Sequence, residues 1–178
     1  FFNKRRVLMH LILTDRPLRA PLSGGADSCL VDLSSRKIAA CTGCFSCWTR
    51  TPGRCVIRDD AVKIYPLIAR CDRLLLVTRI RFGCYDLPMK RMLERSLPIQ
   101  QPFLQLRQGE THHVLRDVCP KDAVLIAYGE SSPEERQLFS RLVERNALNL
   151  CFASSRVLFV DEENLDGAVA REVSRWEE

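Results

Sequence analysis

Unbroken apolar runs alternate along this chain with segments whose apolar residues fall on one side of a helix. Val7 to Leu13 and Leu74 to Val77 are continuous apolar runs bounded by polar residues, a pattern typical of strands buried on both faces of a sheet. The three other segments expected to form strands are residues 28–33, 124–128 and 156–160.

Capping residues predict where helices begin between these strands. Asp86 followed by Pro88 is a typical helix start, and Ser132-Pro133-Glu134-Glu135 is a stronger one because it can form a capping box. The expected helices cover residues 59–70 with a kink at Pro66, residues from 86 onward, residues 132–146 and residues 164–176.

Alternating strands and helices predict one α/β domain over residues 1–178, with a five-stranded parallel sheet and helices on both faces. Ligands of such sheets bind at the carboxyl ends of the strands, so the loops after Leu13, Val77 and Tyr128 form the candidate site. Residues 97–121 show no periodicity, and we expect a long functional or mobile loop there.

The composition is that of a globular protein, with 46% hydrophobic and 28% charged residues and a net charge of +5. The arginines are spread along the chain, so an anionic ligand or an acidic partner is expected rather than nucleic acid. No apolar run reaches membrane-spanning length and the basic opening is short for a signal peptide, so we expect a soluble cytoplasmic protein. The chain does not begin with Met, which indicates a trimmed chain or a segment missing after Leu13.

Four of the nine cysteines lie close together at residues 41–55, in the pattern C-x2-C-x2-C-x7-C. The candidate ligands of a metal centre are Cys41, Cys44, Cys47 and Cys55. Compact runs of this kind hold iron–sulfur clusters in bacterial ferredoxins, whereas structural zinc sites more often split their cysteines into two distant pairs. Free thiols in a tight turn are the third interpretation of the same pattern.

Several segments in order along the chain are similar to one known family. They are Cys41-Thr-Gly-Cys-Phe-Ser-Cys-Trp, Thr51-Pro-Gly-Arg-Cys-Val-Ile-Arg-Asp-Asp60, Glu94-Arg95-Ser96-Leu97-Pro98, Gly109-Glu-Thr-His-His113 and Leu142-Val-Glu-Arg-Asn146. The chain from about Cys41 onward resembles the flavodoxin-like NADPH-dependent FMN reductases, in particular the branch that includes iron–sulfur flavoproteins.

This resemblance implies a flavodoxin-like three-layer sandwich that binds FMN at the carboxyl ends of the strands and a 4Fe-4S cluster on the cysteine loop. It implies an FMN-dependent NAD(P)H oxidoreductase or electron carrier, supplied by NAD(P)H or a ferredoxin-type donor, in a homodimer or a heteromer with a homologue. The residues expected to contact FMN are Thr14, Arg16, Thr78, Arg79, Ile80, Arg81, Phe82, Gly83, Tyr128 and Gly129.

Two segments depart from the family pattern. Only about fourteen residues separate Leu13 from Ser28, too few for both a phosphate-binding loop and a full first helix. The segment 78–83 lacks the family's proline and adds two arginines. These departures favour an alternative function, a degenerate flavodoxin-like subunit without FMN that serves as a binding or scaffolding partner.

The neighbouring His112 and His113 form a further candidate metal site. Adjacent side chains point in different directions on most backbones, so a shared metal ion is not expected. The resemblance instead places them on a loop that covers the flavin or a dimer interface.

Overall fold

The computed structural model describes residues 9–19 and 28–176. Five parallel strands form the central sheet in the order β2-β1-β3-β7-β8, and the short β4 pairs antiparallel with β3. The strands are β1 (His10–Thr14), β2 (Ser28–Asp32), β3 (Arg73–Arg81), β4 (Cys84–Tyr85), β7 (Lys121–Tyr128) and β8 (Phe152–Val160). The first two residues of the expected strand 7–13, and Ser23-Gly24-Gly25 of the shortened loop, lie outside the described residues.

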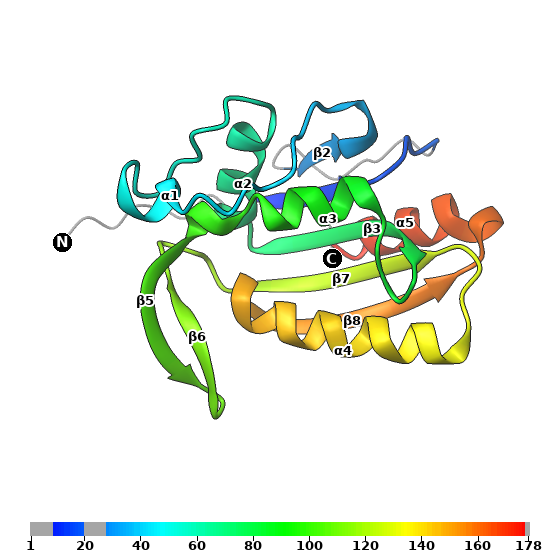
Figure 1. The fold of residues 1–178 in the computed structure, drawn as a ribbon. Coiled ribbons are helices and arrows are strands. Elements are labelled where there is room, and N and C mark those ends of the chain that lie inside the picture. The colour runs from blue at the N-terminus through cyan, green and yellow to red at the C-terminus, as the bar shows by residue number, and fades with distance from the viewer. Residues whose placement is uncertain (1–8, 20–27, 177–178) are drawn as a thin grey trace.

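Helices cover both faces of this sheet, as Figure 1 shows. One face packs on α2 (Ala61–Arg70), α3 (Leu87–Glu94) and α4 (Pro133–Leu150), through residues such as Ile68, Met92 and Phe139. The other face packs on α5 (Leu165–Ser174) through Val169 and its neighbours. When only the five parallel strands are counted along the chain, their order in the sheet is 2-1-3-4-5. This order and the helices on both faces confirm the expected flavodoxin-like α/β sandwich.

The helix starts follow from the capping residues in the sequence. The Asp86 carboxylate accepts the Leu87 N–H at the start of α3, and the Ser132 hydroxyl accepts the Glu135 N–H at the start of α4. Glu135 returns a bond to the Ser132 N–H, so the capping box is complete. α4 continues to Leu150 rather than ending near Asn146, since Leu148 and Leu150 are buried.

The α5 face of the sheet is less covered at its β2 edge. Leu30 of β2 lies beside Ile12 of β1 in the parallel ladder, so both side chains belong to this face. Ile12 is 1% exposed, whereas Leu30 is 45% exposed. The Leu30 part of this face is therefore open in the described structure.

The expected loop at 97–121 is wrong, because most of this segment forms a β-hairpin. The turn of 3₁₀ helix η2 (Leu97–Ile99) leads into β5 (Gln100–Arg107), which pairs antiparallel with β6 (Glu110–Leu115). Gln108 and Gly109 form the two-residue turn, both with positive φ (52° and 80°), as a type I′ turn requires. The hairpin extends from the body of the protein, and Phe103, Leu104 and Leu106 are exposed (Figure 1). With solvent on both faces of β5, the strand has no alternation of apolar and polar residues to identify it.

Two regions lie at opposite ends of the sheet. The short α1 (Ser46–Thr49) of the cysteine loop lies at the end that carries the hairpin, and the carboxyl ends of β7 and β8 lie at the other (Figure 1). The eight residues of β7 alone span about 26 Å. The expected cluster site and the expected flavin site of one chain are therefore far apart.

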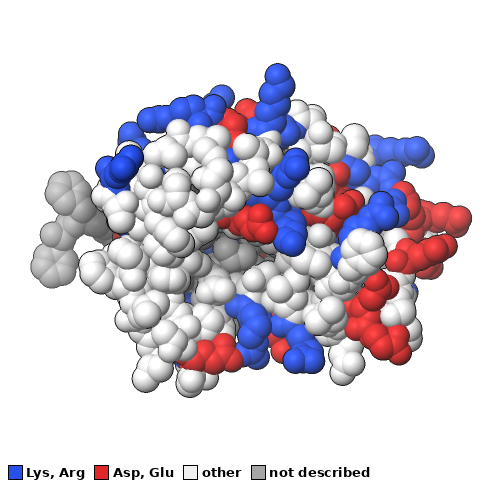
Figure 2. Space-filling model, viewed as in Figure 1, with Lys and Arg blue, Asp and Glu red and all other residues white. Residues whose placement is uncertain are grey.

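Charged side chains of both signs are interspersed on the face seen in Figure 2, in keeping with arginines that are spread along the sequence. The region of that face formed by the hairpin and the cysteine loop is largely uncharged. None of the helices in the described part of the chain combines the length and the apolar content that a membrane-spanning helix needs.

Candidate functional site

The cysteine loop folds back on itself through two residues with left-handed backbone. Gly43 has φ 65° and Phe45 has φ 54°, and the single turn α1 follows directly. The indole N–H of Trp48 donates to the Leu97 carbonyl (3.2 Å), and its ring lies 4.5 Å from that of His113. The loop is thereby fixed to η2 and to the hairpin.

The four thiols converge on one small cavity of about 20 Å³. Burial raises the pKa of Cys47, and the nearness of Cys55, Cys41 and Cys44 raises it further. Cys44 is exposed, and hydrogen bonds from the Ser46 hydroxyl and backbone N–H, together with Thr42, lower its pKa to about 7. One of the four is therefore readily available as a thiolate, the form that ligates metal.

The described residues hold no group of three or more His, Cys, Asp or Glu side chains placed to share one metal ion. Two sulfurs bound to one zinc ion lie within about 4.6 Å of each other, because each Zn–S bond is about 2.3 Å long. An iron–sulfur cluster spreads its four thiolates over four irons and needs no such approach. The donor type and the convergence fit a cluster, and a cavity that holds about one water has to open when a cluster enters.

The two neighbouring histidines are engaged separately. His112 lies between the Asn149 side chain and Glu110, with both contacts at 3.0 Å. His113 contacts the Gln101 carbonyl at 2.9 Å and packs on Trp48. They project from opposite faces of β6, as successive strand residues do, and each has its own partners within the protein.

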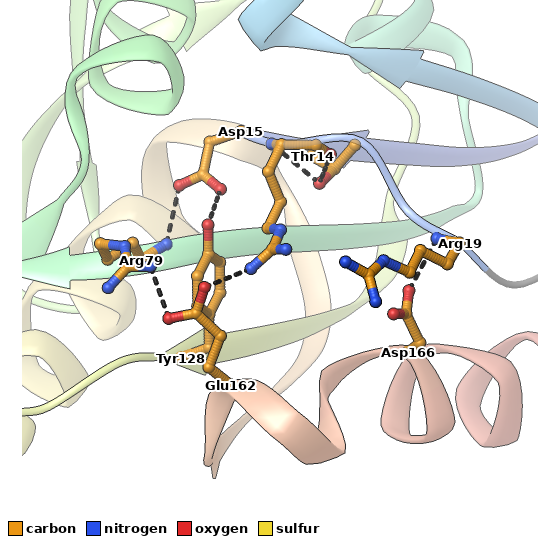
Figure 3. A network of polar contacts seen from close by, with 8 residues as sticks. Thr14, Asp15, Arg19, Arg79, Tyr128, Glu162 and Asp166 are labelled. Atoms are coloured by element: carbon orange, nitrogen blue, oxygen red, sulfur yellow. Dashed lines mark hydrogen bonds and ion pairs between the residues drawn. The ribbon is translucent and has the colours of Figure 1, made fainter.

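At the carboxyl ends of the strands, the central residue is Asp15, which sequence reasoning missed. Its carboxylate accepts hydrogen bonds from the Thr78 hydroxyl (2.9 Å), the Arg79 N–H (2.7 Å) and the Tyr128 hydroxyl (2.7 Å). Figure 3 shows the bonds from Arg79 and Tyr128. Burial raises the pKa of Asp15 despite these three donors. Burial also raises the pKa of Tyr128, and the hydrogen bond to Asp15 adds to this effect. The sequence signal that could have identified Asp15 is its position as an acidic residue directly after a buried strand.

Arg16, Arg79 and Glu162 form a second group of contacts around the Tyr128 ring. The Arg16 and Arg79 guanidinium groups lie 5.7 and 5.0 Å from the centre of the Tyr128 ring. Both bind Glu162 at the end of β8, at 2.5 and 2.6 Å. Thr14 is fully buried and donates its hydroxyl hydrogen bond to the Arg16 carbonyl. Of the expected flavin residues, Thr14, Arg16, Thr78, Arg79 and Tyr128 thus contact one another or these acids. Figure 3 shows Thr14, Arg79 and Tyr128 in this network.

The other expected flavin residues lie beside this network. Ile80, Arg81 and Gly129 line an open pocket of about 830 Å³ between the ends of β3, β7 and β8, and Arg79 faces the same pocket. Phe82 and Gly83 form the turn between β3 and β4, and the Phe82 side chain is 90% exposed. The remaining charged lining consists of Arg136 and the acids Glu130, Asp161, Glu162 and Glu163.

This pocket has the volume of a cofactor site, but its described residues do not fit the phosphate of FMN. The Thr78 and Tyr128 hydroxyls and the Arg79 N–H are already bound to Asp15. The Arg16 and Arg79 guanidinium groups are paired with Glu162. A phosphate dianion placed here would face four acidic side chains of the pocket lining, and Arg81 and Arg136 are the lining guanidinium groups that Glu162 does not pair.

Known proteins support the fold. No family model matches the chain. The chain is 27% identical over 124 residues to the iron–sulfur flavoprotein of Archaeoglobus fulgidus, a match that covers 69% of this chain and 50% of that protein. The chain spans about half the length of the curated relatives it matches.

Solved structures agree on the architecture. An NAD(P)H:quinone oxidoreductase from Methanothermobacter marburgensis superimposes with a TM-score of 0.58 at 12% identity, covering 94% of this chain and 96% of that one. An FMN-dependent NADH-azoreductase from Bacillus anthracis, solved in complex with FMN, gives 0.56 at 10% identity, with the same coverage. At these identities the likeness shows the fold alone. With the sequence relatives, it bears out the resemblance to flavodoxin-like FMN reductases and iron–sulfur flavoproteins.

Proposed function

We propose that this chain is a flavodoxin-like redox protein whose cysteine loop holds a 4Fe-4S cluster and which acts as an electron carrier. The observation that carries the proposal is the convergence of Cys41, Cys44, Cys47 and Cys55 on one cavity, at a spacing unsuited to a single metal ion. The likeness to proteins named iron–sulfur flavoproteins supports it.

A bound cluster supplies one-electron transfer, and the protein supplies position and environment. Cys44 is the exposed member of the set and has the lowered pKa, so it is the first thiolate available to a cluster precursor. Phe45 is 53% exposed beside it. An exposed apolar side chain beside a ligand thiolate is one that an electron partner can cover without desolvating a charge.

The second candidate is a subunit that carries no FMN, and a specific observation favours it. Asp15 takes up the donors at the carboxyl ends of β3 and β7, and Glu162 takes up the guanidinium groups above them. The two proposals are compatible, since the cluster loop and this network lie at opposite ends of the sheet. The chain would then carry electrons through its cluster alone.

Protein purified without oxygen tests both proposals in one sample, by ultraviolet–visible absorbance, iron and acid-labile sulfide content, and FMN released by heat. We expect about four iron and four sulfide per chain, an absorbance that bleaches on reduction, and no flavin bands. Cys47→Ser should lose the iron and sulfide, whereas Cys84→Ser, a cysteine outside the loop, should keep them.

Three results would contradict these proposals. A chain without iron or sulfide after anaerobic reconstitution would exclude the cluster, and about one zinc per chain would replace it with a structural zinc site. FMN in near-stoichiometric amount would support an FMN-dependent NAD(P)H oxidoreductase instead of a flavin-free subunit.

The partners belong to the same proposal. We propose a reduced ferredoxin-type protein as the electron donor of a flavin-free carrier, because direct use of NAD(P)H requires a hydride acceptor such as flavin. A second copy of the chain or an intact homologue is the proposed binding partner. Reduction of the purified protein by NADPH in the absence of any other protein would contradict the choice of donor.

A further inference from the structure

Arg95, directly after α3, is one of the most deeply buried side chains of the described structure, with 1% of its surface exposed. It forms a two-pronged ion pair with Asp59, at 2.6 Å from Nη1 and 2.9 Å from Nη2. A fully buried guanidinium needs several hydrogen bonds to offset its lost hydration. Asp59 supplies only part of them, and the others reveal what the residue does.

The same guanidinium binds the backbone on both sides of the cysteine loop. Nη1 donates to the Ala39 carbonyl (2.9 Å), two residues before Cys41, and Nη2 donates to the Ile57 carbonyl (3.2 Å), two residues after Cys55. Asp59 completes the closure by accepting the Ala39 N–H at 2.9 Å. Arg95 therefore joins the entry and the exit of the loop that carries all four thiols.

One N–H of Arg95 remains unused. Nε is buried and makes no hydrogen bond within the protein. The guanidinium also lies beside the Cys55 thiol. A buried charged group with an unpaired donor next to a candidate ligand sulfur requires an explanation.

We propose that Arg95 is a positioning residue for the cluster, which clamps both ends of the cysteine loop and directs its unpaired N–H to the sulfur of Cys55. This inference rests on the proposed cluster. Donors and positive charge near a ligand sulfur stabilise the more negative, reduced state of a cluster and raise its reduction potential. The clamp and the charge are separable, because lysine can replace the charge but not the fork that binds two carbonyls.

The test uses the reconstituted full chain and the variants Arg95→Gln and Arg95→Lys. Lys90→Gln is the matched control, since it removes one positive charge from the exposed side of the same helix. The readouts are the rate of cluster loss to an iron chelator, iron and sulfide per chain, and the midpoint potential in an anaerobic dithionite titration. Circular dichroism of the apoproteins reports folding.

We expect both Arg95 variants to lose the cluster about tenfold faster than the wild type or more, the range typical of residues that orient metal ligands. Arg95→Gln should also lower the midpoint potential, and Arg95→Lys should lower it less. Lys90→Gln should match the wild type in both properties.

Wild-type protein that holds no iron or sulfide would overturn the proposed function, and this inference with it. A wild-type cluster that Arg95→Gln retains at the same rate and the same potential would overturn the inference alone. If Arg95→Gln does not fold, the folded Arg95→Lys variant decides: cluster loss at the wild-type rate contradicts the clamp.

Discussion

Asp15 shows how one side chain can determine the chemistry at the carboxyl ends of the strands. It follows β1 directly, where the resemblance led us to expect a phosphate loop, and it collects the Thr78 and Tyr128 hydroxyls and the Arg79 N–H. These three donors are therefore satisfied within the chain and are not available to an anionic ligand. These hydrogen bonds stabilise the ionised carboxylate of Asp15, but they offset the cost of its burial only in part, since its pKa is still raised.

The raised pKa of Asp15 predicts a definite dependence of stability on pH. The folded protein binds this proton more readily than the unfolded chain does, so the contribution of Asp15 to the free energy of unfolding falls as the pH rises from 3.8 through the folded-state pKa. We expect the free energy of unfolding of the wild type, minus that of Asp15→Asn, to decrease as the pH rises above 3.8. Urea unfolding at several pH values measures it, and a constant difference would contradict the assignment.

Asp59, unlike Asp15, has a cationic partner, because it forms an ion pair with the buried Arg95. Removing one member of a buried ion pair leaves the other charge without compensation, so we expect Asp59→Asn to lower the free energy of unfolding by about 3–5 kcal/mol. Asp60→Asn is a close control, because its carboxylate accepts a single N–H from Lys37 on the surface, and about 1 kcal/mol is expected. If urea unfolding shows the same loss of free energy of unfolding for Asp59→Asn and Asp60→Asn, the Asp59–Arg95 pair contributes no more than a surface hydrogen bond does.

At the scale of elements, the hairpin of β5 and β6 is the longest part of the fold that the sequence did not predict. Its turn residues are recognisable afterwards, but β5 lacks the alternation that marks a strand with one buried face. The helices and the sheet strands were predicted because their apolar residues face a core and their caps are local. The helix was expected to end at Asn146, but α4 continues for four more residues to Leu150, because Leu148 and Leu150 pack in the interior.

The exposed apolar residues of the hairpin lead to a prediction about this element. Leu104 and Leu106 are 62% and 80% exposed, so the double substitution Leu104→Ser and Leu106→Ser should change the free energy of unfolding by less than about 0.5 kcal/mol per site. Leu125→Ala, in the core, should cost about 2–5 kcal/mol. A large loss from the hairpin substitutions in dilute solution would show that this surface is covered, and gel filtration at rising concentration would then detect the copy that covers it.

At the scale of the whole molecule, the cysteine loop joins elements that are distant in the sequence. It lies between β2 and α2, is clamped by Arg95 after α3, and contacts the hairpin through Trp48 and His113. A ligand held by this loop binds the folded chain, in which the four thiols converge, and not an unfolded one. Ligation should therefore stabilise the protein as a whole.

We expect anaerobic reconstitution with iron and sulfide to raise the midpoint of thermal unfolding by several degrees, since each 1 kcal/mol corresponds to about 2–4 °C at this chain length. Circular dichroism under nitrogen measures the shift. The Cys47→Ser variant should show none under the same treatment. A wild-type midpoint that does not move after iron and sulfide have been incorporated would mean that the loop is not coupled to the rest of the fold.

The sequence by itself determined the architecture and the candidate ligands. Buried strands, local caps and the cysteine spacing depend on neighbours within a few residues, so the main strands, the helix starts and the cysteine set could be predicted from them, and the resemblance to flavodoxin-like reductases supplied the flavodoxin-like arrangement of the sheet. Tertiary structure alone decided what the side chains at the strand ends bind. Asp15 reaches Tyr128, Glu162 reaches Arg16, and Arg95 reaches Asp59, over sequence separations that no local pattern encodes. The physical reason is that burial and pairing depend on which distant residues the fold brings together.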